Sequence, residues 1–377
     1  MKLKIICGQL EITPGRPDVN YKKIIDTIEK ARSLETDILL LPEMALPGYL
    51  IGDIWEQQTF LDDCAYYTEK IVAASENICL IFGSVATEPG KLNEDGRVRK
   101  YNAAFACQNG KLLGGYQGRS FFIKTSLPNY REFDDCRHFY SLQKLCAEEG
   151  ASVSEALQPL EIVIRGTSLR IGVMLCEDGW TENYHLNVPQ TLAANGAQLL
   201  CNLSCSPYTL GKNRKRNRLF SAQACTASIP LIYCNNVGIQ NNGKNIFTYD
   251  GCSSAYNGDG SLVTSAPMYE DTFLELTWDT EANHLISTCP PAVLPRPSLR
   301  HSQISAAMRH QTYDHRSFRR HRQRRNRRDV CRYPGTGKYP AAQPTFMLQL
   351  RCHAQQRAAA GAGTGRQLRR NAHQRKL

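Results

Sequence analysis

The amino-acid sequence predicts an α/β fold in which sheets and helices pack in layers. Two observations support this prediction. Short apolar runs alternate with stretches whose apolar residues recur at helical spacing, and this alternation continues to about residue 285 without an internal repeat. The 377 residues are enough for one large domain or two ordinary ones, and for a substantial buried core.

The expected elements alternate along the chain. Apolar runs of strand length, bounded by turn residues, predict internal strands, and longer amphipathic stretches predict helices that cover the sheets. The expected strands and hairpins cover residues 2–10, 36–44, 78–86, 99–117, 160–178, 198–204 and 230–238. The expected helices cover residues 19–34, 60–76, 188–197 and 218–228.

Charge divides the chain into two parts. A formal net charge of +11 would ordinarily suggest a polyanionic partner. Of the 46 basic and 35 acidic residues, however, 20 and 2 lie from Arg296 onward, which leaves 26 and 33 before it. The preceding part is therefore mildly acidic, like an ordinary globular protein. We expect residues 1–288 to form the folded domain and residues 289–377 to form a disordered basic tail.

The opening residues and the cysteines predict a cytoplasmic protein without a metal. The start MKLKIICGQLEITPG has too short an apolar run for a secretory signal, and no apolar run approaches transmembrane length. Most of the 15 cysteines are scattered in apolar contexts, such as Cys7 and Cys234, which is typical of small core residues in a reducing compartment. Cys201 and Cys205 form a C-x3-C without a second pair at zinc spacing, so no metal site is expected.

Three reactive residues each follow an apolar run of strand length. Glu43 ends DILLLPE, Lys124 ends SFFIK, and Cys176 ends LRIGVMLC. Strand ends are where open α/β architectures gather functional side chains. A cysteine is a nucleophile as the thiolate, a glutamate can act as general base and later as general acid, and a lysine could hold both in charged form or stabilise an oxyanion. Together these residues could attack an amide by acyl transfer.

The segments LLLPEMALPGY (39–49), FFIKTSLPNYREFDDCRHF (121–139) and IGVMLCEDGW (171–180) resemble the nitrilase, or carbon–nitrogen hydrolase, superfamily. The resemblance covers roughly residues 3–275, with three motifs in the family's order. It implies an α-β-β-α sandwich in which Glu43 is the general base, Lys124 supports the oxyanion or transition state, and Cys176 is the nucleophile.

Two longer segments are similar to the glutaminase domain of glutamine-dependent NAD(+) synthetases: KTSLPNYREFDDCRHF and CNLSCSPYTLGKNRKR. This resemblance implies that Tyr130, Ser206 and Lys212 bind L-glutamine. A cation suits the α-carboxylate of the substrate, and the hydroxyls suit its polar head group. The neighbouring basic residues are expected to belong to a solvated start of a helix: Arg214, Lys215, Arg216 and Arg218.

The resemblance also implies a second domain, which uses ATP and Mg to amidate deamido-NAD with the released ammonia, and a homo-oligomer. The glutaminase step itself implies no cofactor. The SGGxDS loop that such a domain uses to bind pyrophosphate is absent from this chain. Codons can be chosen for Phe318 to Arg324 so that the frame one nucleotide later reads Ser-Gly-Gly-Ile-Asp-Ser-Ala. Our hypothesis is that residues 289–377 are an out-of-frame remnant of the synthetase domain, and the nucleotide sequence tests it.

Two other functions compete with a glutaminase. One is another amidase of the same superfamily, such as an ω-amidase or an N-carbamoyl amino acid hydrolase, which Tyr130, Ser206 and Lys212 disfavour. The other is a nucleic-acid-binding protein with a basic arm, since the tail has the necessary charge. The tail lacks regularly interleaved aromatic residues, and this function would leave the three reactive residues unused. We therefore expect neither a nucleic acid nor a membrane as a partner.

Overall fold

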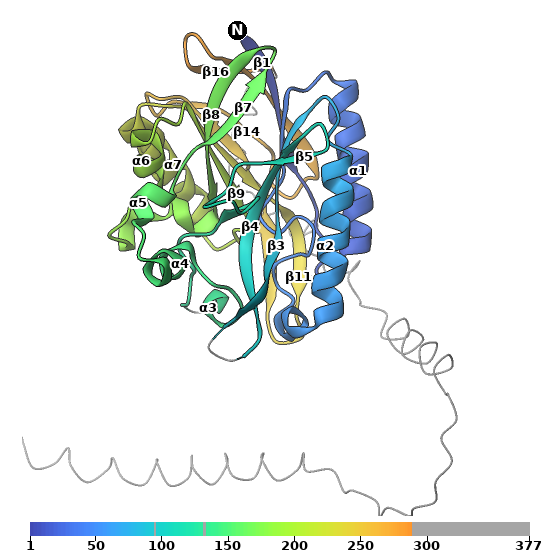
Figure 1. Ribbon diagram of the computed structural model, residues 1–377. Coiled ribbons are helices and arrows are strands. Elements are labelled where there is room, and N and C mark those ends of the chain that lie inside the picture. Colours follow the sequence, from blue (N-terminus) through green and yellow to red (C-terminus); the bar gives the residue numbers. More distant parts are fainter. Residues whose placement is uncertain (94–95, 131–132, 289–377) are drawn as a thin grey trace, which may run out of the picture. The chain divides into compact units, whose positions relative to one another are not determined.

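The computed structural model describes residues 1–93, 96–130 and 133–288. These residues form a sandwich of two sheets with helices on both outer faces (Figure 1). The fold class expected from the sequence is confirmed. The expected basic tail, residues 289–377, lies outside the described residues. No helix in the described part of the chain is long and apolar enough to cross a bilayer.

The first sheet has the order β16-β15-β1-β2-β3-β4-β5, and β6 pairs with β4. Strands β1, β2 and β3 run parallel to one another, as expected for strands joined by crossover helices. Its strands are β1 (Lys2–Gln9), β2 (Ile38–Leu40), β3 (Cys79–Leu92), β4 (Val98–Gln108), β5 (Lys111–Leu113), β6 (Phe122–Ile123), β15 (Thr272–Asp279) and β16 (His284–Ser287). The helices that cover it are α1 (Pro17–Ser33) and α2 (Gln58–Ala73).

The second sheet has the order β14-β13-β10-β9-β8-β7. Strands β8, β9 and β10 are parallel, and two helices lie on its outer face. Its strands are β7 (Leu160–Ile164), β8 (Thr167–Leu175), β9 (Leu199–Ser204), β10 (Leu231–Asn235), β13 (Ser254–Tyr256) and β14 (Leu262–Ser265). The helices are α6 (Val188–Ala194) and α7 (Lys212–Ala227).

Shorter elements complete the described chain. A two-stranded sheet stands apart from the two large ones and is formed by β11 (Val237–Asn241) and β12 (Ile246–Asp250). The remaining helices are α3 (Asp135–His138), α4 (Leu142–Glu149) and α5 (Val153–Ala156). The 3-10 helices are η1 (Gly52–Glu56), η2 (Cys176–Gly179) and η3 (Thr181–Asn183).

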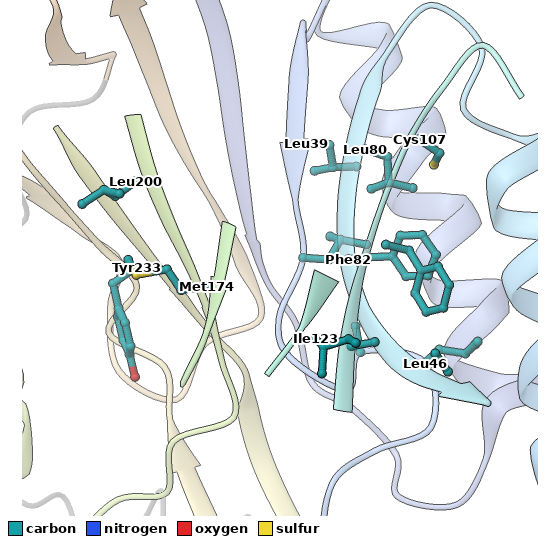
Figure 2. Packing of buried hydrophobic residues seen from close by; sticks show 14 of the residues in the cluster. Leu39, Leu46, Leu80, Phe82, Cys107, Ile123, Met174, Leu200 and Tyr233 are labelled. Carbon is teal, nitrogen blue, oxygen red and sulfur yellow. The ribbon is translucent and has the colours of Figure 1, made fainter. Parts of the chain in front are cut away.

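Both faces of each sheet are buried, so the internal strands are apolar on both sides. Along β2 and β3, successive side chains alternate between the helix-facing layer and the layer between the sheets. Figure 2 shows side chains of the helix-facing layer, with Leu39 and Leu80 on one sheet and Leu200 and Tyr233 on the other. The layer between the sheets contains, among others, Ile5, Leu40, Ile81, Val173, Leu199 and Ile232.

This packing fixes the ends of the internal strands, which carry the functional side chains. Glu43 follows β2, and Lys124 follows the short strand β6. Cys176 directly follows β8 and opens η2. Ser206 follows β9, and Lys212 is the first residue of α7. Residues that lie far apart in the sequence therefore meet where the strands of both sheets end.

Candidate active site

A cavity of about 440 Å³ opens at these strand ends. All six residues singled out in the sequence line it: Glu43, Lys124, Tyr130, Cys176, Ser206 and Lys212. The cavity is large enough for a small polar substrate and has both acidic and basic groups in its wall.

Glu43 is a fully buried carboxylate with three donors. Its Oε1 accepts hydrogen bonds from Asn102 Nδ2 at 2.7 Å and from Lys124 Nζ at 2.8 Å. Its Oε2 accepts from the backbone N–H of Cys205 at 2.8 Å. These bonds hold the charged form in place, since a buried carboxylate is tolerated only when it is paired and hydrogen-bonded.

A glycine beneath Glu43 makes this position possible. A Cβ at Gly83 of β3 would lie 2.5 Å from the Cα of Glu43 and 2.4 Å from the backbone N of Met44. Real Cβ atoms do not approach other atoms so closely, so any larger residue would push the loop away. The strand therefore supports the carboxylate through close contact between two backbones.

Lys124 lies between two carboxylates. Its Nζ is 2.8 Å from Glu43 Oε1 and 2.9 Å from Asp135 Oδ2, and all three side chains are buried. Burial alone would lower the pKa of Lys124, but the charges of Asp135 and Glu43 outweigh it and hold the pKa well above its usual value. Tyr49 Oη donates to the other oxygen of Asp135. Lys124 is therefore a fixed cation, and its third N–H is not used by either carboxylate.

Cys176 lies at the turn between β8 and η2 with a positive φ of 40°. Left-handed backbone is costly for a residue with a Cβ, and such strain is typical of functional sites. Burial raises the pKa of the Cys176 thiol, the Glu43 charge adds to the rise, and Lys124 opposes it. The surroundings of Cys176 therefore favour the neutral thiol.

Asp178 joins the loops that carry Lys124 and Cys176. Its carboxylate accepts hydrogen bonds from the backbone N–H groups of Thr125 at 3.0 Å, Ser126 at 2.8 Å and Leu175 at 3.2 Å. Asp178 is buried, so these donors replace the water that the carboxylate has lost. One side chain thus connects the end of β6 in the first sheet with the end of β8 in the second.

The cavity lining contains a second acidic group, Glu177, that the sequence did not reveal. Glu177 accepts hydrogen bonds from Tyr184 Oη at 2.9 Å and from Tyr130 Oη at 3.2 Å. Burial raises the pKa of Glu177, while the tyrosine hydroxyls, Lys124 and Lys212 favour its charged form. Tyr130 itself is 47% exposed and lies at the cavity mouth.

The N-terminus of α7 brings positive charge to the cavity. Lys212 is the first residue of this 16-residue helix, and its Nζ lies 5.5 Å from the centre of the Trp180 ring. Burial lowers the pKa of Lys212, and the charge of Arg216 lowers it further. The positive end of the helix dipole adds to the lysine charge and favours an anion here.

The expectation of a solvated cluster of basic residues on α7 is wrong for Arg216. Arg216 is 1% exposed and forms an ion pair with the buried Asp250. Lys215 lines the cavity and pairs with Glu182 at 2.8 Å, whereas Arg214 and Arg218 are exposed as expected. Helical spacing explains the difference, because residues 212 and 216 share the face that lies against the sheet.

No group of three or more potential metal ligands occurs among the residues that the structure describes. The buried groups Glu43, Lys124 and Asp135 are instead paired with one another. Of the supporting residues, Asp135, Glu177 and Asp178 lie inside the motifs around Lys124 and Cys176, and they are acidic. Their proximity in sequence to the reactive residues was the available signal.

Comparison with known proteins identifies the family. Residues 4–281 match the carbon-nitrogen hydrolase family. The chain belongs to the carbon–nitrogen hydrolases. The matched residues include every residue of the cavity and all of both sheets except β16 and the start of β1, and the membership makes the chain an enzyme of that family.

Several curated relatives are glutamine-dependent NAD(+) synthetases. A glutamine-dependent NAD(+) synthetase of Thermotoga maritima is 28% identical over 291 residues, which cover 77% of this chain and 44% of that protein. Another, from Synechocystis sp., is 29% identical over 292 residues, which cover 74% of this chain and 47% of that protein. The chain thus spans less than half the length of these curated relatives.

Solved structures show the same fold. The glutamine-dependent NAD+ synthetase of Acinetobacter baumannii matches with a TM-score of 0.61 at 24% identity, covering 78% of this chain and 49% of that one. A carbon-nitrogen hydrolase of Helicobacter pylori matches with a TM-score of 0.58 at 17% identity, covering 75% of this chain and 91% of that one. The sandwich of this carbon–nitrogen hydrolase is therefore shared by longer and by shorter proteins.

Proposed function

We propose that this carbon–nitrogen hydrolase releases ammonia from L-glutamine. The observation that carries the proposal is the distribution of charge in the cavity. Besides Glu43, Lys124 and Cys176, the cavity is lined by a buried acidic group, Glu177, and by a basic group, Lys212. An α-amino acid carries one cation and one anion on its head group, so this pair complements it, while its side-chain amide can reach the reactive residues.

The chemistry follows from the contacts of the three reactive residues. Glu43 Oε2 has one hydrogen bond, from the Cys205 N–H, which leaves it an acceptor position for the thiol proton. As Cys176 Sγ attacks the amide carbon, Glu43 takes this proton, and the third N–H of Lys124 donates to the developing oxyanion. The C–N bond then breaks, the proton passes from Glu43 to the leaving nitrogen, and ammonia departs from a thioester.

The second half of the reaction uses the same groups. Glu43, again unprotonated, accepts a proton from a water molecule that attacks the thioester carbon. The C–S bond breaks, and glutamate leaves as Cys176 regains a proton. Lys124 remains charged throughout, because its two carboxylate neighbours raise its pKa. A single base therefore serves both half-reactions.

Glu177 favours glutamine over the substrates of the competing amidases. The keto acid amide hydrolysed by an ω-amidase and the carbamoylated amino acid hydrolysed by an N-carbamoyl amino acid hydrolase both lack a free ammonium group. Neither would neutralise Glu177, whose burial makes an unpaired charge costly. Tyr130, Ser206 and Lys212 are proposed to bind the rest of the glutamine head group.

The relatives suggest a destination for the ammonia. Because they are named as NAD(+) synthetases, we propose that the ammonia amidates deamido-NAD in a step that consumes ATP and is carried out by a synthetase domain in an oligomer, in the cytoplasm. Mg belongs to that domain and not to this cavity. This step requires an intact synthetase domain, supplied within the same chain or separately.

The test is ammonia release from purified protein. L-glutamine, L-asparagine, a 2-keto acid ω-amide and an N-carbamoyl amino acid are compared at equal concentration. We expect release from glutamine to exceed release from the other three, and to be lost in Cys176→Ala. Equal release from the variant, or a preference for a substrate without an α-ammonium group, would reject the proposed function.

A further inference from the structure

Arg216 and Asp250 form a buried ion pair next to Ser206 and one helical turn after Lys212. Arg216 Nη1 is 3.0 Å from Asp250 Oδ2, and Arg216 Nη2 is 2.9 Å from Asp250 Oδ1. This two-pronged geometry fixes the orientation of the guanidinium as well as its position. Neither side chain is more than 2% exposed. The pair is therefore a rigid link between α7 and the end of β12.

The same guanidinium holds the segment that contains Ser206. Arg216 Nη2 donates a further hydrogen bond to the carbonyl oxygen of Ser206 at 3.3 Å. Asn235 also binds this backbone. Its Oδ1 accepts from the Ser206 N–H at 2.9 Å, and its Nδ2 donates to the Ser206 carbonyl at 3.2 Å. The backbone of Ser206 is thus fixed on both sides, and its side chain lines the cavity from this fixed backbone.

Arg216 and Lys212 are connected through the first turns of α7. The two residues are one helical turn apart on α7, and helix geometry places them on the same face. Gly211, which precedes the helix, has a φ of 77° and makes no side-chain capping bond, so the first turn lacks the usual cap. The Arg216–Asp250 pair, in the second turn, ties this end of the helix to the protein.

We propose that Arg216, paired with Asp250, is a positioning residue that places Ser206 and Lys212 together and so controls affinity for the amino-acid head group. The inference rests on the proposed glutaminase function. The hydrogen bonds of the Arg216 guanidinium go to Asp250 and Ser206, and not to Glu43, Lys124 or Cys176. Loss of the pair should therefore change substrate binding and leave the acyl-transfer chemistry in place.

The test compares Arg216→Lys with Arg218→Lys. Lysine keeps the charge of Arg216 but cannot make the two-pronged bond. Arg218 is on the same helix with a side chain 75% exposed, which makes it a matched control. For Arg216→Lys we expect the KM for glutamine to rise by about tenfold or more while kcat changes by less than about threefold. The control should match the parent in both constants.

A second readout separates positioning from a general structural role. Iodoacetamide carries no amino-acid head group, so its rate of alkylation at Cys176, located by peptide mass analysis, should be equal in the parent and in Arg216→Lys. If the lysine variant does not fold, the double variant Arg216→Met with Asp250→Leu replaces the buried pair by apolar groups of similar size. The same rise in KM is expected from it.

Three outcomes would overturn the inference. An unchanged KM shows that the pair does not position the head-group residues. A parallel loss of kcat and of alkylation at Cys176 shows that the pair supports the whole fold. A parent protein that does not hydrolyse glutamine rejects the proposed function as well, whereas an active parent with an unaffected variant rejects the inference alone.

Discussion

The catalytic residues and the residues proposed to bind the amino-acid head group lie in different surroundings. Glu43, Lys124 and Asp135 are at most 3% exposed and form a continuous chain of ion pairs. Among the residues proposed to bind the head group, Ser206 and Glu177 are buried, but Tyr130 is 47% exposed and Lys212 lies at the start of a helix. A low-dielectric, rigid surround strengthens electrostatic catalysis, whereas a head-group site must remain open to let the substrate in. The difference predicts that substitutions of the catalytic residues act on kcat, whereas substitutions of the head-group residues act on KM.

The largest effect is expected from Cys176→Ala. Removal of the sulfur should lower kcat for glutamine by on the order of 10⁴-fold or more, since covalent catalysis is lost. The measurement is steady-state ammonia release. Cys205→Ala is the matched control, because Cys205 lines the same cavity but contacts Glu43 only through its backbone N–H. An equal loss in both variants would contradict the assignment of the nucleophile.

A smaller loss is expected from Gly83→Ala. The new methyl group would lie 2.5 Å from the Cα of Glu43 and would displace the base, which we expect to lower kcat by roughly 10²-fold. Gly172→Ala is the control, because its Cβ meets the side chains of Leu200 and Leu192 instead. We expect it to lower Tm without a comparable change in kcat. Equal kcat in the Gly83 variant and the parent would show that the base tolerates displacement.

Lys212→Met tests the proposed binding of the amino-acid head group. The variant keeps a chain of similar length but loses the charge, so the KM for glutamine should rise by about 10-fold to 100-fold while kcat changes little. Arg214→Met, at an exposed position two residues away, serves as the control. A loss confined to kcat would contradict the assignment of Lys212 to substrate binding.

The smallest effect is the dependence of KM on pH. Because the pKa of Glu177 is raised, its charge is lost as the pH falls to values where an ordinary glutamate stays ionised. Because the pKa of Lys212 is lowered, its charge is lost as the pH rises to values where an ordinary lysine stays protonated. The KM for glutamine should therefore increase at both ends of a series from about pH 5 to about pH 9.

Single substitutions assign the two limbs of this profile. Glu177→Gln should remove the acidic limb, and Lys212→Met should remove the alkaline limb. A profile that keeps both limbs in both variants would place the titrating groups elsewhere, for example on the substrate itself.

The sequence was sufficient to predict the α/β fold class and, through its family resemblance, the sandwich and six of the residues that line the cavity, because each of the six follows an apolar strand or lies in a distinctive motif. It was not sufficient for the supporting groups. Asp135 belongs to a quoted motif, but its pairing with Lys124 depends on how the loop after β6 folds back. Arg216 was expected in solvent, because a run of basic residues gives no sign of which one meets a buried partner. Asp250 is 34 residues further along the chain.

Asp178 has a mechanical consequence. Its carboxyl group accepts hydrogen bonds from the backbone N–H groups of Thr125 and Ser126, which follow β6 of the first sheet, and of Leu175, which ends β8 of the second. Two packed sheets can slide slightly past one another, and such shear would ordinarily change the spacing between groups mounted on different sheets. A carboxyl group that is hydrogen-bonded to both backbones ties the two strand ends together and resists such sliding. The spacing between lysine and nucleophile is then insensitive to shear elsewhere in the sandwich.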